Sequence, residues 1–73
     1  LSFMEYIFRD HAEYRMKKRG LLKEEVIEAI EHSDKTLKKH GKYYAQKNIG
    51  RGTIEVYHER TERYIRIITI YWL

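Results

Sequence analysis

A histidine and an arginine, two residue types that suit chemistry on an anionic group, stand four positions apart near the start of the chain. His11 and Arg15 belong to residues 10–20, which read Asp-His-Ala-Glu-Tyr-Arg-Met-Lys-Lys-Arg-Gly. On a helix this spacing places the imidazole and the guanidinium on one stripe, which Lys18 and Arg19 extend. The simpler interpretation is a solvated charged face, and spacing alone favours it. The alternative is a site for an anionic ligand.

Signals at both ends of residues 10–20 predict a helix of about two to three turns. Asp10 is a favoured N-cap residue, and Glu13 three positions later completes a capping-box pattern. Gly20 stands where a helix is commonly closed by a residue in the left-handed conformation. Ala12 and Met16 share the face that we expect to pack inward.

The composition predicts one globular domain over residues 1–73. Of the 73 residues 42% are hydrophobic and none is cysteine, so we expect one small core and neither disulfides nor thiolate sites. No apolar run approaches the roughly 18 residues of a membrane span, and no secretory signal pattern is present. We therefore expect a cytoplasmic protein with no membrane partner.

The histidines do not form a metal-binding pattern. They lack the i,i+4 pairing or the accompanying carboxylate that zinc sites usually show. The residues concerned are His11, His32, His40 and His58. We expect no metal and no cofactor.

Positive charge is concentrated in the second half of the chain. Residues 1–33 carry six Lys or Arg and seven Asp or Glu, a net charge of −1, whereas residues 34–73 carry nine and four, a net charge of +5; together they give the +4 of the whole chain. The second half also holds most of the tyrosines. A basic, tyrosine-rich half indicates a polyanionic partner, RNA first, although solubility alone also explains this charge.

Hydrophobic periodicity predicts an α+β fold in which an N-terminal strand and a helical hairpin pack on one face of a small antiparallel sheet. Residues 5–9 resemble a short aromatic strand, and residues 22–32 form an amphipathic helix with Val26, Ala29 and Ile30 on its apolar face. Four strands follow, of which the first two are rich in lysine and suit the edge of a sheet. These strands are expected at residues 36–40, 42–47, 53–58 and 63–72. The side on which the first strand pairs stays open.

The last two strands can be aligned by matching side chains across a turn at Arg60 and Thr61. Tyr57 then faces Tyr64, and similar pairs of apolar and of oppositely charged residues follow along the strands. In this register, the face turned toward the helices carries Ile54, Val56, His58, Ile65, Ile67, Thr69 and Tyr71.

The other face of the last strand then ends in an exposed apolar patch. The patch consists of Ile68, Ile70 and Trp72. An exposed patch of this kind usually marks a partner surface, so the register predicts a protein contact or a homodimer at the end of the chain.

Three stretches resemble one known family. They read His11-Ala12-x-x-Arg15-Met16-x-x-Arg19-Gly20, Glu24-Glu25-Val26 on the second helix, and the closing Ile68-Thr69-Ile70-Tyr71. They resemble a small bacterial and archaeal family of uncharacterised domains, which is similar to the RelE and BrnT toxins of toxin–antitoxin systems. The resemblance covers nearly the whole chain and implies a RelE-like fold of two helices on a small antiparallel sheet. Leu22 departs from the Ser or Thr that usually opens the family's second helix.

Because these toxins are ribonucleases neutralised by an antitoxin chain, the resemblance implies metal-independent cleavage of RNA through attack of a 2′-hydroxyl on the neighbouring phosphate. The reaction needs a base, a cation for the phosphorane charge and an acid for the leaving oxygen. The resemblance implies His11 as base or acid, Arg15 as the phosphate clamp and Tyr71 as a hydrogen-bond or proton donor. RNA would also contact Arg19, Lys47, Arg51, His58 and Arg66, with Arg51 projected outward by its glycine-flanked turn.

Each of these residues also has a structural interpretation. His11 fits a first-turn helix residue bonded to a backbone carbonyl, and Arg15 fits a structural ion pair. Tyr71 fits a core tyrosine with a satisfied hydroxyl, and His58 fits a surface residue at a strand end.

Two classes of function therefore remain open. The first is a toxin-type endoribonuclease that acts on RNA and is neutralised by an antitoxin. The second is a non-catalytic module, either monomeric or dimeric, that binds RNA or a protein chain through its sheet or a strand edge.

Overall fold

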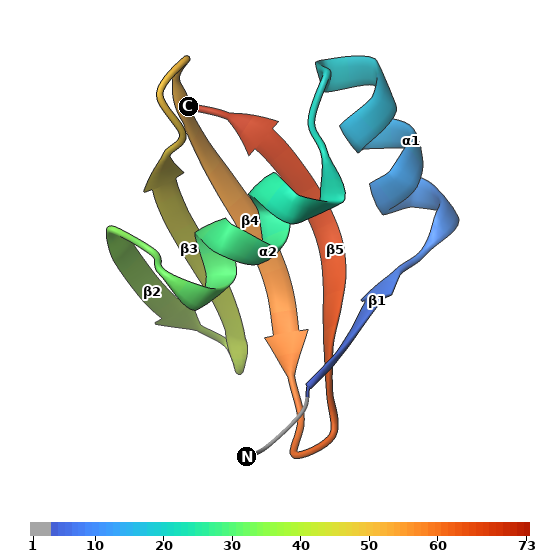
Figure 1. Cartoon of the computed structure of the whole chain (residues 1–73). Coiled ribbons are helices and arrows are strands. Elements are labelled where there is room, and N and C mark those ends of the chain that lie inside the picture. Colours follow the sequence, from blue (N-terminus) through green and yellow to red (C-terminus); the bar gives the residue numbers. More distant parts are fainter. Residues whose placement is uncertain (1–3) are drawn as a thin grey trace.

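The chain forms two helices and a five-stranded sheet, and the computed structural model describes residues 4–73 (Figure 1). In chain order the elements are β1 (Glu5–Phe8), α1 (Asp10–Arg19), α2 (Lys23–Glu31), β2 (Lys35–Lys39), β3 (Lys42–Asn48), β4 (Thr53–Arg60) and β5 (Tyr64–Trp72). The predicted α+β class is confirmed, and each predicted element is present with small shifts of its boundaries.

The strand order across the sheet is β1-β5-β4-β3-β2, and β2 to β5 form an antiparallel meander. The sheet is mixed rather than wholly antiparallel, because β1 pairs in parallel with β5. β2 is an edge strand, as its lysine content predicted, whereas β3 is internal. β1 pairs only with residues 64–67, so α1 lies beside the remaining half of β5 (Figure 1).

The start of α1 differs from the prediction, whereas its end agrees with it. Arg9 is the N-cap residue and no side chain caps the helix, so the predicted capping box of Asp10 and Glu13 is wrong. Both carboxylates lie instead in the first turn, where the helix dipole favours negative charge. Gly20 closes the helix in the left-handed conformation (φ 68°), as predicted.

The β4–β5 hairpin pairs in a different register from the predicted one. Its turn is centred two residues later along the chain. The hydroxyl of Thr61 holds this turn by accepting hydrogen bonds from the backbone N–H groups of Arg63 and Tyr64 (3.2 and 3.1 Å). Together with one extra residue in β5, this turn places Tyr57 opposite Thr69 instead of Tyr64.

A β-bulge in β5 changes which side chains face α2. The pairing steps from Ile67 to Thr69 on β5 while β4 advances by one residue, so Ile68 is the extra residue. The residues after a bulge point to the face opposite to the one that strict alternation gives. Tyr71 therefore points away from α2, and the prediction that it lies on the helix-facing side is wrong.

The apolar patch predicted at the end of β5 is not exposed. Ile70 is completely buried, and Trp72 packs against the core. The indole N–H of Trp72 donates a hydrogen bond to the carbonyl of Arg19 (3.1 Å). The bulge explains the difference, because it turns Ile70 and Trp72 toward the helices. The structure therefore does not present these residues as one exposed patch, and the homodimer stays a prediction.

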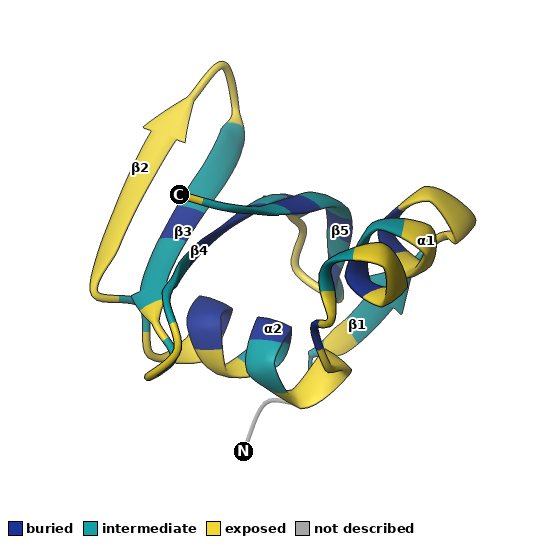
Figure 2. Ribbon diagram, turned by 90° about the horizontal axis from the view of Figure 1, so that it is seen from above, coloured by how far each residue is buried: buried dark blue, intermediate teal, exposed yellow. Residues whose placement is uncertain are grey.

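The core lies between α2, α1 and one face of the sheet. Its buried residues are Ala12, Met16, Leu21, Val26, Ala29, Ile30, Ala45, Ile54, Val56, Ile65, Ile67 and Ile70. The opposite face is covered by neither helix, and the β2–β3 end of the sheet curves toward it (Figure 2). We call this the open face; it carries Tyr44, Gln46, Glu55, Tyr57, Glu59, Arg66, Thr69 and Tyr71.

Candidate functional site

Two tyrosine rings stack at the centre of the open face. Tyr44 on β3 and Tyr57 on β4 pair directly, and residues opposite each other on antiparallel strands share a face. Their ring centroids are 4.6 Å apart and the ring planes are inclined by 22°. Loss of solvation and the neighbouring Tyr57 phenol raise the pKa of Tyr44, so this ring is uncharged at neutral pH. Each ring covers one face of the other, so only the outer faces of the pair can stack on a further ring.

A buried carboxylate lies beside the two tyrosines. Glu55 is 8% exposed and accepts a hydrogen bond from the side-chain amide of Gln46 (2.7 Å) and another from the hydroxyl of Tyr71. Burial and the hydrogen bond to Glu55 raise the pKa of Tyr71. Tyr71 therefore stays protonated at neutral pH, and its hydroxyl donates a hydrogen bond to Glu55.

A depression of about 430 Å³ adjoins this carboxylate, and it is lined by Leu37, Lys38, Lys39, Tyr44 and Glu55. β2 lies at the curved end of the sheet (Figure 2), and three of its residues line the depression. The depression combines the side chain of Lys39, an aromatic ring and a carboxylate, whereas the amine of Lys38 lies over the ring of Tyr43 on the opposite face of β2. Such a set can bind an anionic group, a flat ring and N–H donors together.

Arg66 lies on the open face, where its predicted role in RNA binding would require it. Its Nε forms an ion pair with Glu59 at 2.5 Å, directly across the β4–β5 pair. The hydrogen bond from Arg66 holds the pKa of Glu59 below its usual value. The guanidinium is thus fixed on this face with its charge largely compensated.

The three residues predicted to be catalytic are not joined to one another. His11 is exposed in the first turn of α1, and Arg15 is half-buried one turn later, with its guanidinium 5.9 Å from the ring centroid of Tyr14. Tyr71 lies on the open face and is bonded to Glu55. Within residues 4–73 no hydrogen bond or ion pair links His11 or Arg15 to Tyr71. The predicted catalytic trio is therefore not preassembled.

Arg51 is exposed, as its turn predicted, but its guanidinium is bound to other parts of the chain and is not free for RNA. Its guanidinium forms an ion pair with Glu25 and donates to the carbonyl of Gly20 (2.7 Å). It also lies 5.6 Å from the ring centroid of Trp72. The bond from Arg51 lowers the pKa of Glu25. Arg51 therefore ties the β3–β4 turn to the junction between α1 and α2.

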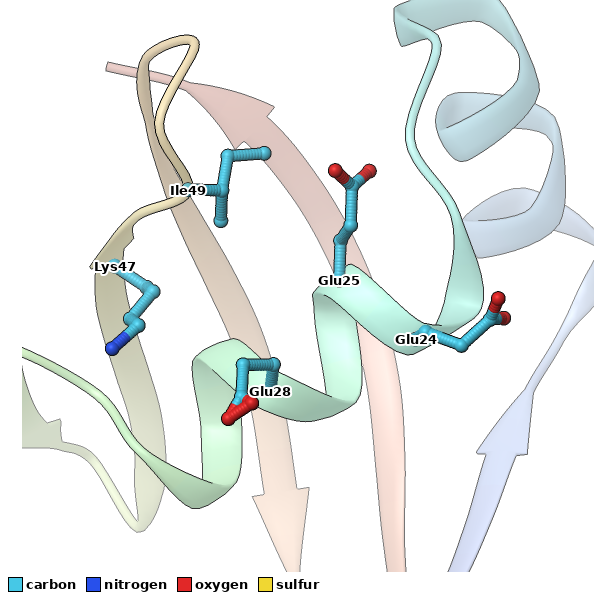
Figure 3. A pocket seen from close by; sticks show the side chains of 5 residues that line it. All are labelled: Glu24, Glu25, Glu28, Lys47 and Ile49. Carbon is cyan, nitrogen blue, oxygen red and sulfur yellow. The ribbon is translucent and has the colours of Figure 1, made fainter.

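Lys47 lies beside an acidic depression on the α2 side of the sheet. This depression of about 330 Å³ is lined by Glu24, Glu25, Glu28, Lys47 and Ile49 (Figure 3). The amine of Lys47 is 3.6 Å from Asp34. Since Asp34 pairs with this amine and three glutamates line the same depression, the position of Lys47 does not favour an RNA phosphate.

Arg19 is the last residue of α1, and it is held in place through its backbone. Its carbonyl accepts the indole N–H of Trp72. One guanidinium nitrogen of Arg19, Nη1, is buried and has no hydrogen-bond partner among the described residues. The predicted contact of Arg19 with RNA stays a prediction.

His58 is completely buried on the helix-facing side of β4, so the structure does not support direct contact with RNA, and the surface interpretation is also wrong. The Nδ1 of His58 lies 3.0 Å from the carbonyl of Val56, and the Nε of Arg60 donates to its Nε2 (3.0 Å). The ring of Tyr43 stacks on the imidazole with centroids 5.7 Å apart. Burial lowers the pKa of His58.

Glu55 and Gln46, the polar centre of the open face, were not predicted as functional residues. Both were inside predicted strands. The signal that could have found them is alternation, because Gln46 is two residues from Tyr44 and Glu55 is two residues from Tyr57. Aligning the two tyrosines across β3 and β4 would have placed the acid and the amide opposite each other.

Within residues 4–73, no group of three or more His, Cys, Asp or Glu side chains is arranged to hold a metal ion. Neither of the two described helices has the length and apolar character needed to cross a membrane.

The match of a family model to residues 8–72 places the chain in a family described as a domain of unknown function, DUF4258. The chain belongs to this family, because the match covers nearly all of it. No curated protein and no solved structure matches the chain significantly.

Proposed function

We propose that the chain binds single-stranded RNA through the open face of its sheet. The observation that carries this proposal is the stacked pair of Tyr44 and Tyr57 on a face that no helix covers, beside the lysine-rich edge strand β2. Aromatic rings on an accessible sheet receive unpaired bases, and neighbouring lysines hold the phosphates. The overall charge of +4 favours such a partner.

The test is the affinity for short fluorescent RNA oligonucleotides, measured by anisotropy, for the wild type and for Tyr57→Leu. Base–aromatic stacking contributes enough that losing one ring should weaken binding about tenfold. Tyr14→Leu is the matched control, because Tyr14 is an exposed tyrosine on α1, away from the open face. Equal affinity of the wild type and Tyr57→Leu would contradict the proposal.

RNA cleavage of the toxin type is a second candidate function, and one observation favours it. The imidazole of His11 is exposed, and Arg15 one turn later makes no ion pair with another described residue, so both side chains are accessible to a phosphate. This candidate function includes three further proposals. They are a relation to the RelE and BrnT toxins, an antitoxin partner and a cytoplasmic location.

Cleavage is tested by incubating the same RNAs with the protein in EDTA and separating the products by gel electrophoresis. Products that form with the wild type and disappear with His11→Ala would support the toxin-type reaction. Tight binding without products would leave the chain as a binding module, the alternative that the sequence had left open.

A further inference from the structure

The depression beside β2 on the open face brings together cationic, aromatic and acidic residues, and no single structural role explains this combination. Its lining consists of Leu37, Lys38, Lys39, Tyr44 and Glu55. Glu55 is the least expected member, because a buried carboxylate usually has a cationic partner. Among residues 4–73, no lysine, arginine or histidine forms an ion pair with Glu55. Its only side-chain hydrogen-bond donors there are Gln46 and Tyr71.

A count of hydrogen-bonding capacity shows what this carboxylate lacks. Each carboxylate oxygen can accept about two hydrogen bonds. The Oε1 of Glu55 accepts one from Tyr71, and the Oε2 accepts one from Gln46. Each oxygen therefore keeps one acceptor position. Two N–H donors side by side, at the spacing of the two oxygens, would match both positions.

Among RNA bases, guanine presents this arrangement on its Watson–Crick edge, with the N1–H and the exocyclic N2 amine next to each other. Adenine and cytosine place an acceptor nitrogen beside their amino group, and uracil flanks its N3–H with two carbonyl oxygens. A carboxylate repels a hydrogen-bond acceptor of a base that lies next to it, because both atoms carry negative charge. The carboxylate therefore distinguishes guanine from the other three bases.

We propose that this depression binds a guanine base of single-stranded RNA; the proposal rests on the RNA-binding function proposed above and names the base that it selects. Glu55 accepts the two guanine donors, and the ring of Tyr44 stacks on the base. The amine of Lys39, on the open-face side of β2, holds the adjoining phosphate. Gln46 and Tyr71 are positioning residues that fix the carboxylate.

The experiment compares labelled pentanucleotides of uridine that carry one central guanosine, inosine or adenosine, with anisotropy as the readout. Inosine differs from guanosine only by lacking the N2 amine. For the wild type we expect guanosine to bind at least about fivefold more tightly than inosine, and about tenfold or more above adenosine, since one bidentate pair contributes this much discrimination.

The variant Glu55→Gln should abolish the preference for guanosine, because its amide group turns a donor toward one of the guanine donors. Glu62→Gln is the matched control: it removes the same charge from the exposed β4–β5 loop and should keep the preference. Affinity for oligouridine measures whether each variant retains a folded binding surface. The comparison of guanosine with inosine on the wild type needs no variant.

The outcomes separate the two proposals. A guanosine preference that Glu55→Gln removes and Glu62→Gln retains supports the guanine site. Equal binding of the three pentanucleotides by the wild type overturns the guanine site and leaves RNA binding in place. A preference that persists in Glu55→Gln also overturns it. Failure of the wild type to bind any of these RNAs overturns the RNA-binding function itself.

Discussion

His58 shows how one buried polar side chain is accommodated beside a charged one. A neutral imidazole with its proton on Nδ1 satisfies both neighbours, because Nδ1–H donates to the carbonyl of Val56 and Nε2 accepts from Arg60. A second proton would have to sit on Nε2, against the guanidinium of Arg60. Tyr43, stacked on the other side, offers no acid to compensate. The fold therefore requires the neutral form.

This requirement predicts a pH dependence of stability. Because burial lowers the pKa of His58 in the folded chain, the unfolded chain binds more protons as pH falls below about 6.5. The contribution of His58 to stability should be complete above that pH and should be lost as pH falls through the folded-state pKa. The difference between the wild type and His58→Gln, measured by urea unfolding at pH 8, 6 and 5, should therefore shrink toward low pH.

His11→Gln is the control for this measurement, because His11 is exposed on α1. Its pH profile should follow that of the wild type. The stability difference between the wild type and His58→Gln could instead stay constant across this pH range. That result would show that protonating the buried imidazole does not destabilise the folded chain.

At the scale of elements, composition and periodicity located the helices and strands correctly, but they did not align the strands. The β-branched and aromatic residues of β4 and β5 predict two strands, whichever residues of the neighbouring strand they pair with. Their register depends on the hydroxyl of Thr61, which moves the turn, and on the bulge at Ile68. Neither feature leaves a periodic signal. The predicted helix-facing position of Tyr71 is wrong for this reason, because one extra residue turned Tyr71 to the other face.

The bulge predicts an asymmetry between two single-residue deletions in β5. Removing Ile68 leaves every later β5 residue opposite its present partner on β4, so Ile70 stays in the core. Removing Ile70 can keep Tyr71 and Trp72 in place only by setting Thr69 opposite Val56, in the buried position. The second deletion should cost about 2 kcal/mol or more beyond the first, because it replaces a buried isoleucine with a smaller polar residue.

Urea unfolding, followed by the fluorescence of Trp72, measures both deletions. Ile68→Ala is the control that keeps the chain length and the bulge, and it should lose little because Ile68 is only half-buried. If deletion of Ile68 destabilised the chain as much as deletion of Ile70, the bulge would itself be an essential part of the β4–β5 pairing.

At the scale of the whole molecule, the formal charge counted from the sequence does not predict where an anion can bind. The sequence correctly showed that positive charge gathers in the second half. It could not show that Lys47, Arg51 and Arg66 are each paired with an acid, because these pairings depend on tertiary contacts. The lysines of β2 form no such pairs among the described residues. β2 therefore carries exposed positive charge without an acidic partner at the edge of the open face.

This distribution predicts the salt dependence of RNA binding. Each phosphate neutralised on a single strand adds about 0.7 to the slope of log affinity against log salt concentration. The double variant Lys35→Gln/Lys39→Gln, which changes two exposed β2 residues, should lower the magnitude of that slope by up to about 1.4. The control Lys17→Gln/Lys18→Gln removes the same charge from α1 and should change the slope less. Equal slopes for the two double variants would mean that RNA affinity depends only on the net charge. This result would contradict the proposal that RNA binds at the open face.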